Sequence, residues 1–307
     1  MKQEYHGILS SIHHDTGENH PEILELYPGI ELSFISASGK DAFHVCHAPL
    51  PQMLEINYCI SGRMGWDMGN GNRIYLGPGD FSLNTMDVCG DSAITLPNGS
   101  YEGLAIYINL EQLSAQPPAS LVGSPVTGEA LWEKYCKDGT CTALAGNETI
   151  QQIFLGLYEP PKEMRLAWQK IKVLELLLVL SQIEAGQEKH LTEYRAEKAE
   201  VICQIHDQLT SKLEQRYTID SLSRQYLMNP TTLKSMFKAI YGTSIAAHIR
   251  EHRMAYAARL LRTSEQSIAE IAQKVGYDSQ SRFSSVFKEK YHMLPKAYRR
   301  NHSTESI

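Results

Sequence analysis

The chain has 307 residues, of which 42% are hydrophobic and 21% are charged, the composition of a globular protein long enough for two domains. Its longest apolar stretch, VLELLLVL at 173–180, is too short to cross a bilayer, and no positively charged region followed by an apolar run opens the sequence. We therefore expect no transmembrane helix and no signal peptide. The formal net charge is −6, but residues 196–307 carry 17 Lys/Arg against 11 Asp/Glu, whereas residues 1–195 carry 12 against 24. A basic last third on an acidic chain indicates a polyanionic partner for that third alone.

Cysteine usage bears on the cellular compartment. So few cysteines in so long a chain fit a reducing cytoplasm better than a disulfide framework, so we expect free thiols and a cytoplasmic protein. The cysteines are Cys46, Cys59, Cys89, Cys136, Cys141 and Cys203.

Short strands are the first elements expected in chain order. A polar leader, HHDTGENH at 13–20, is interpreted as a mobile arm rather than a site. From about 20 to 110, short apolar runs are separated by turn signals such as GNGN at 69–72 and GPGD at 77–80. The predicted strands include 53–60, 72–76, 80–86 and 104–110. Regular short strands with frequent turns are typical of a barrel or a sandwich.

Two kinds of site are considered in this strand region. His44, Cys46, His47 and Glu55 have side chains that bind zinc or iron. However, the odd spacing of His44 and His47 places them on opposite faces of a strand. We therefore expect ordinary histidines and no cofactor, with metal or haem binding left as the alternative. The candidate walls of a small-molecule pocket are aromatic, with plain core packing as the alternative: Tyr58, Trp66, Tyr75 and Tyr107.

Helices are expected from about 129 onward, after an aperiodic connector at 114–125. The strongest helix, at 164–184, has apolar residues around nearly its whole circumference. If one face packs on the strands, a second apolar face remains to be covered by a partner subunit, and we assign Leu177 and Leu180 to that face. The alternative is a helix buried within its own chain. The polar segment 184–195 is interpreted as a linker.

A weak internal repeat occupies the basic third. Ile219 and Leu222 match residues 49 positions later, and Leu233 and Phe237 match residues 50 positions later. Each unit is predicted to be a short helix, a turn and a longer helix, with the one-residue slip lying in the turn. Asn229 is a good N-cap for the first long helix, and Gly276 supplies the left-handed turn before the second.

The outward faces of the two long helices carry hydroxyls, amides and cations. They are Thr231, Thr232, Lys234, Ser235 and Lys238 in the first unit, and Gln280, Ser281, Arg282, Ser284, Ser285 and Lys288 in the second. Such groups hydrogen-bond phosphate oxygens and base edges in the major groove. The pattern predicts a tandem helix-turn-helix whose long helices enter successive major grooves. The alternative is two amphipathic hairpins in an ordinary helical bundle.

The last hundred residues resemble the AraC/XylS family of bacterial transcription regulators. The motifs that carry the resemblance are NPTTLKSMFKAIYGTS (229–244), RMAYAARLL (253–261), SIAEIAQKVGY (267–277), SQSRFSSVFKEKY (279–291) and LPKAYR (294–299). His292, where the family usually has Gly, and His248, where an aromatic residue is more common, depart from the pattern. The resemblance implies a cupin-like, effector-binding barrel, a helical dimerisation segment, and an activator that contacts RNA polymerase.

We therefore expect an α+β protein with three parts. Residues 1–125 form a cupin-like barrel with an N-terminal arm, 126–195 a helical dimerisation segment and linker, and 196–307 an all-α DNA-binding domain. The expected function is a cytoplasmic, homodimeric regulator without catalytic residues, metal or cofactor, which binds promoter DNA and responds to a small-molecule effector. The alternatives are a metal-dependent cupin enzyme fused to a DNA-binding domain and a regulator without a ligand. The sequence does not identify the effector or the operator, nor does it separate activation from repression.

Overall fold

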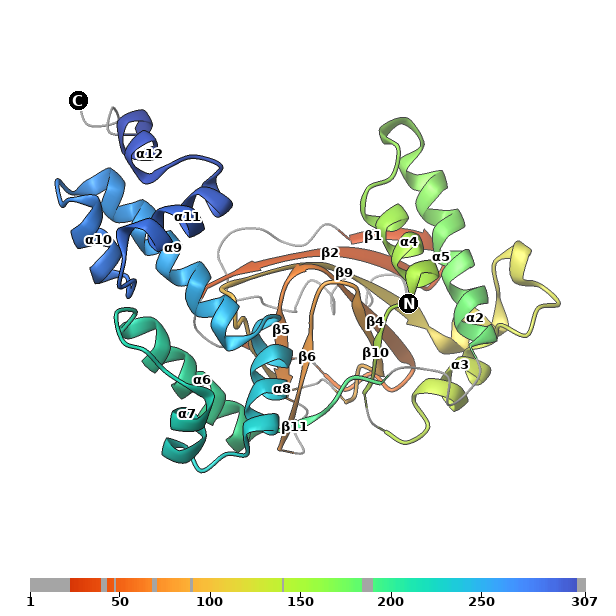
Figure 1. Ribbon diagram of the computed structural model, residues 1–307. Coiled ribbons are helices and arrows are strands. Elements are labelled where there is room, and N and C mark those ends of the chain that lie inside the picture. Colours follow the sequence, from red (N-terminus) through yellow and green to blue (C-terminus); the bar gives the residue numbers. More distant parts are fainter. Residues whose placement is uncertain are drawn as a thin grey trace. The chain divides into compact units, whose positions relative to one another are not determined.

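The computed structural model describes residues 23–39, 43–46, 48–67, 71–88, 91–139, 141–183 and 190–302. The chain divides into two compact units, Met1–Ala196 and Glu197–Ile307. The α+β class predicted from the sequence is confirmed, because strands dominate the first unit and helices form the second (Figure 1). In the described residues, no helix combines the length and apolarity needed to cross a membrane.

Two antiparallel sheets build the first unit. One has the strand order β1-β2-β9-β4-β7-β10 and the other the order β11-β6-β5-β8-β3. The strands of the first sheet are β1 (Ile23–Tyr27), β2 (Ile30–Ser38), β4 (Met53–Gly62), β7 (Asp80–Thr85), β9 (Ser100–Asn109) and β10 (Thr142–Ala145). Those of the second are β3 (Phe43–Cys46), β5 (Met64–Asp67), β6 (Asn72–Leu76), β8 (Asp91–Thr95) and β11 (Tyr194–Arg195).

The strands predicted from the sequence are confirmed, but they do not close into a single barrel. Among the described residues, no strand ladder joins the two sheets. The chain passes from the first sheet to the second at Gly62, whose φ is +76°, and returns through the turn that begins at Gly77. In that turn the Gly77 N–H donates to Asp80 Oδ2 over 2.9 Å. They are two of several crossings, because the chain also passes between the sheets at β2 to β3, β3 to β4, β7 to β8 and β8 to β9. The predicted hairpin between β5 and β6 is present, although residues 68–70 of its turn lie outside the described ones.

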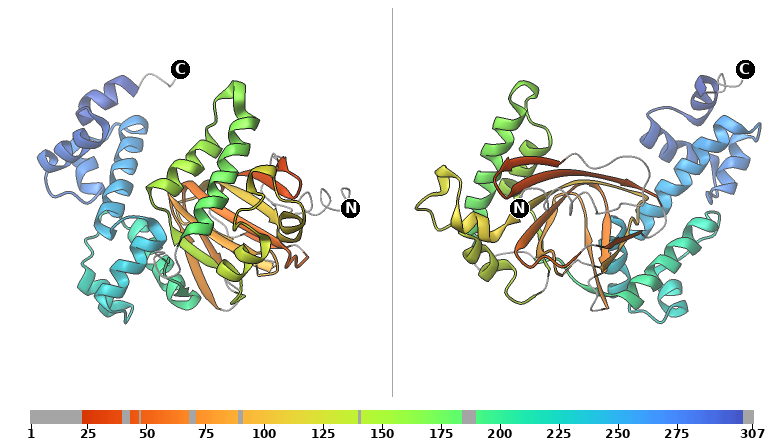
Figure 2. Two further views of the ribbon diagram at one scale, coloured as in Figure 1. Left: turned by 90° about the vertical axis from the view of Figure 1, so that its right-hand side faces the viewer. Right: turned by 180° about the vertical axis from the view of Figure 1, so that it is seen from behind.

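Helices cover the outer face of the six-stranded sheet (Figure 2). They are α2 (Leu110–Ala115), η1 (Ala119–Leu121), α3 (Gly128–Tyr135), α4 (Glu148–Tyr158), η2 (Lys162–Met164) and α5 (Arg165–Gln182). Alternation along the strands separates two cores. On β4, Leu54, Ile56 and Tyr58 pack against the helices, whereas Met53 and Cys59 pack between the sheets.

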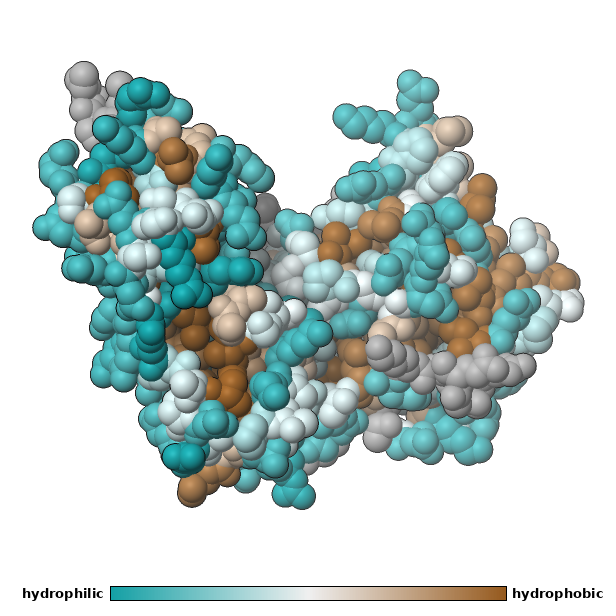
Figure 3. All heavy atoms as spheres, in the orientation of Figure 1, coloured by the Kyte–Doolittle hydropathy of each residue, from teal (hydrophilic) through white to brown (hydrophobic). Residues whose placement is uncertain are grey.

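Helix α5 matches the helix predicted at 164–184, but the predicted subunit face is wrong. Leu177 and Leu180 are fully buried within their own unit, because they lie on the side of α5 that packs against the sheet and α4. Other large apolar side chains are exposed on this helix and just before it, namely Met164, Trp168, Ile171 and Leu178. Figure 3 shows brown, hydrophobic surface over the helices of the first unit. Within α5 the spacings of three residues from Trp168 to Ile171 and seven residues from Ile171 to Leu178 keep these side chains on one face of the helix, which we call the exposed stripe of α5.

The second unit is entirely helical in its described residues. It comprises α6 (Ala196–Ser211), α7 (Ile219–Gln225), α8 (Pro230–Tyr241), α9 (Ile245–Thr263), α10 (Ile268–Lys274), α11 (Gln280–Tyr291) and α12 (Pro295–His302). Leu233, Met236 and Phe237 of α8 are buried, as are Phe283 and Phe287 of α11. The predicted periodicity of both long helices is therefore confirmed.

Candidate nucleic-acid interface

The two predicted helix-turn-helix units are formed by α7 with α8 and by α10 with α11. Their turns carry equivalent hydrogen bonds. In the first unit the Met228 N–H donates to the carbonyl oxygen of Ser223 over 3.0 Å, and in the second the Tyr277 N–H donates to that of Ala272 over 2.9 Å. Both donors and acceptors are separated by 49 positions, the spacing read from the sequence. The internal repeat is therefore a structural repeat.

The two turns reach the same left-handed backbone with different residues. Gly276 has a φ of +82° and Leu227 a φ of +50°. A Cβ at position 276 would lie 2.6 Å from both the Leu213 carbonyl oxygen and Arg253 Nη2, so this position requires glycine. The Leu227 side chain is 94% exposed, so the first turn has room for it.

Helix α8 presents the face predicted to contact DNA. Asn229 caps it by accepting from the Thr231 N–H over 2.8 Å, and Pro230 occupies the first helical position. Of the predicted residues, Thr232 is half-buried and the exposed ones are Thr231, Lys234, Ser235 and Lys238. The Ser235 hydroxyl donates to the Thr232 carbonyl oxygen over 3.0 Å, so its oxygen can still accept a hydrogen bond.

Helix α11 repeats this arrangement. Ser279 caps it by accepting from the Arg282 N–H over 3.3 Å. Of the predicted residues, Ser284 is half-buried and the exposed ones are Gln280, Ser281, Arg282, Ser285 and Lys288. The first turn therefore displays an amide and a guanidinium, and the last turn an ammonium. These groups are suited to base edges and to phosphates respectively.

Arg253, in the middle of α9, joins the two helix-turn-helix units. Its Nε donates to the Leu213 carbonyl oxygen over 2.8 Å, and its Nη2 donates to that of Gln215 over 3.0 Å. Both acceptors belong to the loop that leads into α7. On the other side, Nη1 donates to the carbonyl oxygen of Gly276, in the turn before α11, over 3.3 Å. One side chain thus links the loop before α7 and the turn before α11 to the connecting helix α9.

Within the second compact unit, a concave surface of about 830 Å³ is lined by the loop before α7, by α9, and by the turn before α11 together with α11 itself. Arg216, Arg250 and Arg282 contribute cations to it, and Arg216 forms an ion pair with Asp278. Sequence reasoning missed Arg216 and Arg250, because neither lies on α8 or α11, the two helices predicted to read DNA and here called the reading helices. The arginines of α9 are visible in the sequence, but tertiary packing decides which of them line the concave surface.

The predicted pocket residues lie in different parts of the first compact unit. Tyr58 and Tyr107 are on opposite faces of the six-stranded sheet, whereas Trp66 and Tyr75 belong to the five-stranded sheet. Tyr58 stacks on Phe154 of α4 with ring centroids 4.1 Å apart, and burial raises the pKa of Tyr58 to about 12. Trp66 and Tyr107 are buried in the core between the two sheets, and Tyr75 is also buried. Tyr58 is therefore separated from Trp66 and Tyr107 by the sheet itself.

The inner face of the six-stranded sheet carries a polar row that the sequence did not reveal. Strand register places Tyr107 between Glu31 and Glu55, and Glu55 beside Asn84. The Asn84 amide donates to Glu55 Oε2 over 3.3 Å. A largely apolar interior with a few convergent polar groups is typical of a small-molecule site.

The other candidate metal residues fall partly outside the described structure. His44 and Cys46 belong to β3, but their side chains are outside the described residues, as are His47 and the leader at 13–20. Glu55 lies on β4 and contacts Asn84. Cys59, Cys136, Cys141 and Cys203 are free thiols.

Several known proteins are similar to this chain. A family described as a helix-turn-helix domain matches residues 222–301. The transcriptional regulator AlkR of Acinetobacter baylyi is 30% identical over 153 residues, which cover 47% of this chain and 50% of AlkR. This chain thus spans about half the length of AlkR. The regulatory protein SoxS of Salmonella typhimurium is 30% identical over 100 residues, covering 33% of this chain and 94% of SoxS.

A solved structure is also similar to part of this chain. It is the C-terminal domain of AraT, a response regulator from Geobacillus stearothermophilus, with 30% identity and a TM-score of 0.33. The match covers 35% of this chain and 89% of that domain.

Proposed function

Because the chain belongs to the AraC/XylS family of transcriptional regulators, we propose that its second unit binds promoter double-stranded DNA through α8 and α11. The observation that carries the proposal is the pair of equivalent helix-turn-helix units, each with an exposed face of hydroxyls, amides and cations. The reading helices would enter successive major grooves about 34 Å apart. The Arg253 contacts support this geometry, because they join the loop before α7 and the turn before α11 to one helix, α9. The basic concave surface between the units would face the intervening phosphates.

Salt dependence of DNA binding by the full chain tests this proposal. If about six phosphates are neutralised, a plot of the logarithm of the DNA affinity against the logarithm of the salt concentration should have a slope of about −5. A slope near zero on a bound promoter fragment, or no binding at low salt, would contradict it. A Lys234→Ala, Lys238→Ala double variant is a useful comparison, because two phosphate contacts fewer should reduce the slope by about two.

We propose further that the first unit binds a small-molecule effector between its two sheets. The supporting observations are the buried aromatic rings of Trp66 and Tyr107 and the polar row that contains Glu31 and Glu55. Two carboxyl groups beside one phenol favour an apolar effector that carries a hydrogen-bond donor or a positive charge. Tyr75 is retained as a candidate wall residue, and Tyr58 is not expected to touch the same ligand.

Tryptophan fluorescence offers the direct test, since Trp66 is buried between the sheets whereas Trp132 and Trp168 are 38% and 37% exposed. Aromatic amines and the matching carboxylates are added to the purified chain. Saturable quenching by amines, lost in Trp66→Phe and weakened in Glu55→Gln, would support the site. Equal responses to both series, or quenching that survives Trp66→Phe, would exclude it.

We propose that the exposed stripe of α5 forms a homodimer interface. Ile171 is 63% exposed and Leu178 is 38% exposed, which is unusual for large apolar residues that share one helix face. Replacing Ile171 and Leu178 by Glu should give a folded monomer in sedimentation. The buried position Leu177 provides the contrast, because Leu177→Asp should unfold the unit rather than dissociate it. An unchanged oligomeric state in the Ile171, Leu178 double variant would refute the interface.

The family resemblance supports three finer proposals. The protein acts in the cytoplasm where promoter DNA lies, it regulates transcription without catalysing a reaction, and it activates by contacting RNA polymerase. Transcription reconstituted from a promoter bound by the purified protein tests the last of these. A decrease in transcript on addition of the protein would identify a repressor instead.

A further inference from the structure

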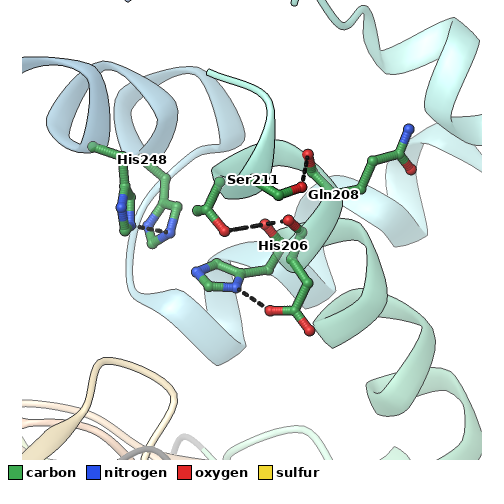
Figure 4. Close-up of polar contacts among 7 residues, drawn as sticks. His206, Gln208, Ser211 and His248 are labelled. Atoms are coloured by element: carbon green, nitrogen blue, oxygen red, sulfur yellow. Dashed lines mark hydrogen bonds and ion pairs between the residues drawn. The ribbon is translucent and has the colours of Figure 1, made fainter. Parts of the chain in front are cut away.

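Three histidines come together in the second unit, away from the DNA-binding faces. His206 lies on α6, and His248 and His252 lie one turn apart on α9. One ring nitrogen of each residue is within 4.8 Å of the others. Figure 4 shows the ring of His206 on the side of α6 that faces His248. The cluster therefore bridges the first helix of the unit and its connecting helix.

The spacing of one nitrogen pair matches an edge of a metal coordination sphere, and the third nitrogen lies within 4.8 Å of both. His252 Nε2 and His248 Nε2 are 3.1 Å apart. Nitrogens bound to one tetrahedral zinc ion at about 2.0–2.1 Å are separated by about 3.3 Å. The pair is thus within a few tenths of an ångström of that edge without any helix movement. Two histidines four residues apart on a helix, with a third from a neighbouring helix, form a three-nitrogen set that leaves a fourth position for water.

Surrounding groups hold His206 and His248 in place. His206 Nδ1 lies 3.2 Å from Asp207 Oδ1, so a proton held on Nδ1 would leave Nε2 with its lone pair available. The ring of His206 stacks on Tyr241, with centroids 4.4 Å apart and an interplanar angle of 10°. His248 packs edge-on to Phe237 at 5.3 Å. Carboxylate-supported, packed imidazoles are typical of metal-binding histidines.

The burial of the three histidines differs across the cluster. His248 is 8% exposed, whereas His206 and His252 are half-buried, so one side of the cluster is open to an incoming ion.

We propose that His206, His248 and His252 bind a divalent transition-metal ion of the zinc class, which clamps α6 to α9. The consequence is mechanical. Helix α9 follows α8 after three residues and carries Arg253. An ion that holds α6 against α9 would therefore restrict the movement of α9 and of the adjoining helix α8. The competing explanation is a hydrogen bond between the neutral imidazoles of His248 and His252, with no ion.

Metal titration of the full, chelator-stripped chain separates these explanations. Zinc is titrated against a competing chelator dye, and cobalt is used as a spectroscopic substitute. The variants are His252→Gln and His206→Gln, which each remove one ligand, and His248→Phe, which introduces an aromatic residue at that position. His292→Asn is the matched control, because His292 is exposed on the same unit and its left-handed backbone suits Asn. Since other histidines can also bind zinc, the readout is the difference between variants.

We expect the wild type and His292→Asn to bind one more zinc ion than each ligand variant, and to show a cobalt ligand-field band that those variants lack. Asp207→Asn should keep the stoichiometry but weaken affinity about 10- to 100-fold, as loss of a supporting carboxylate does. This variant guards against a folding artefact, because the Asp207 side chain is 81% exposed. Equal stoichiometry and equal cobalt spectra in all variants would overturn the proposal, as would unchanged affinity in Asp207→Asn.

Discussion

Replacement of Arg253 is expected to uncouple the two reading helices. Arg253→Met keeps the aliphatic stem but removes three hydrogen bonds, to the carbonyl oxygens of Leu213, Gln215 and Gly276. The bonds to Leu213 and Gly276 are partly buried, whereas the bond to Gln215 is exposed. Counting only the first two, at about 1.5 kcal/mol for a bond from a charged donor, gives a loss of about 3 kcal/mol in the free energy of unfolding.

The effect on DNA binding should depend on the length of the site. With the spacing between α8 and α11 no longer held, the advantage of binding two grooves at once shrinks. We expect affinity for a duplex with both half-sites to fall at least about 10-fold, and affinity for a single half-site to change much less.

Two measurements check the Arg253 reasoning. Denaturant unfolding of the full chain is followed by helical circular dichroism, because Trp66, Trp132 and Trp168 all report on the first unit. Anisotropy titrations then compare a complete site with a half-site. Arg259→Met is the control, since Arg259 is exposed on the same helix and its cation–π contact with a tyrosine ring contributes about 1 kcal/mol or less. Equal losses on both duplexes, or unchanged stability, would refute the linking role of Arg253.

Three further predictions concern single positions. Arg282→Ala should cost about 1–3 kcal/mol on the best site and much less on scrambled DNA, whereas Lys288→Ala should weaken both alike and reduce the salt slope by about one; binding to both duplexes across a salt series decides this, and equal losses for Arg282→Ala would exclude base reading. His292 ends α11 with a φ of +57°, so His292→Gly should raise the free energy of unfolding by about 0.5–1 kcal/mol in denaturant titrations, and a loss would show that the histidine makes a stabilising contact. Burial raises the pKa of the Cys59 and Cys136 thiols to about 12, so only about one thiol in ten thousand is ionised at pH 8; iodoacetamide should modify these two residues only in denaturant, or as pH rises toward that value, and labelling of Cys59 or Cys136 in the native chain at pH 8, located by peptide mass spectrometry, would contradict this.

Much of the DNA-binding unit follows from the sequence because its signals are local. Caps such as Asn229 and Ser279 act within one helical turn, and the buried residues of α8 and α11 recur at helical spacing. The repeat then fixed the equivalence of the two turns. The strands of the first unit were also legible, because turn residues separate short apolar runs.

Other features depended on which surfaces meet in space. The apolar residues of α5 are similar in kind, and only packing against the sheet and α4 buries Leu177 while it leaves Ile171 exposed. The division into two sheets depends on repeated crossings of the chain, such as those at Gly62 and Gly77, and local patterns do not reveal them. A one-residue change in register would reverse every inward side chain, so the polar row around Tyr107 could not be read from the sequence.

The three-histidine cluster and the contacts of Arg253 also combine local features of the sequence with contacts between distant segments. His248 and His252 are recognisable as a helical pair, since four residues separate them, but His206 joins them only because α6 packs against α9. Arg253 belongs to a recognisable motif, yet its acceptors lie about 23 to 40 residues away in two different loops. Helical period and capping are properties of neighbouring residues and are written in the sequence. Contacts between distant segments arise from the burial and shape of whole elements, which only the folded chain brings together.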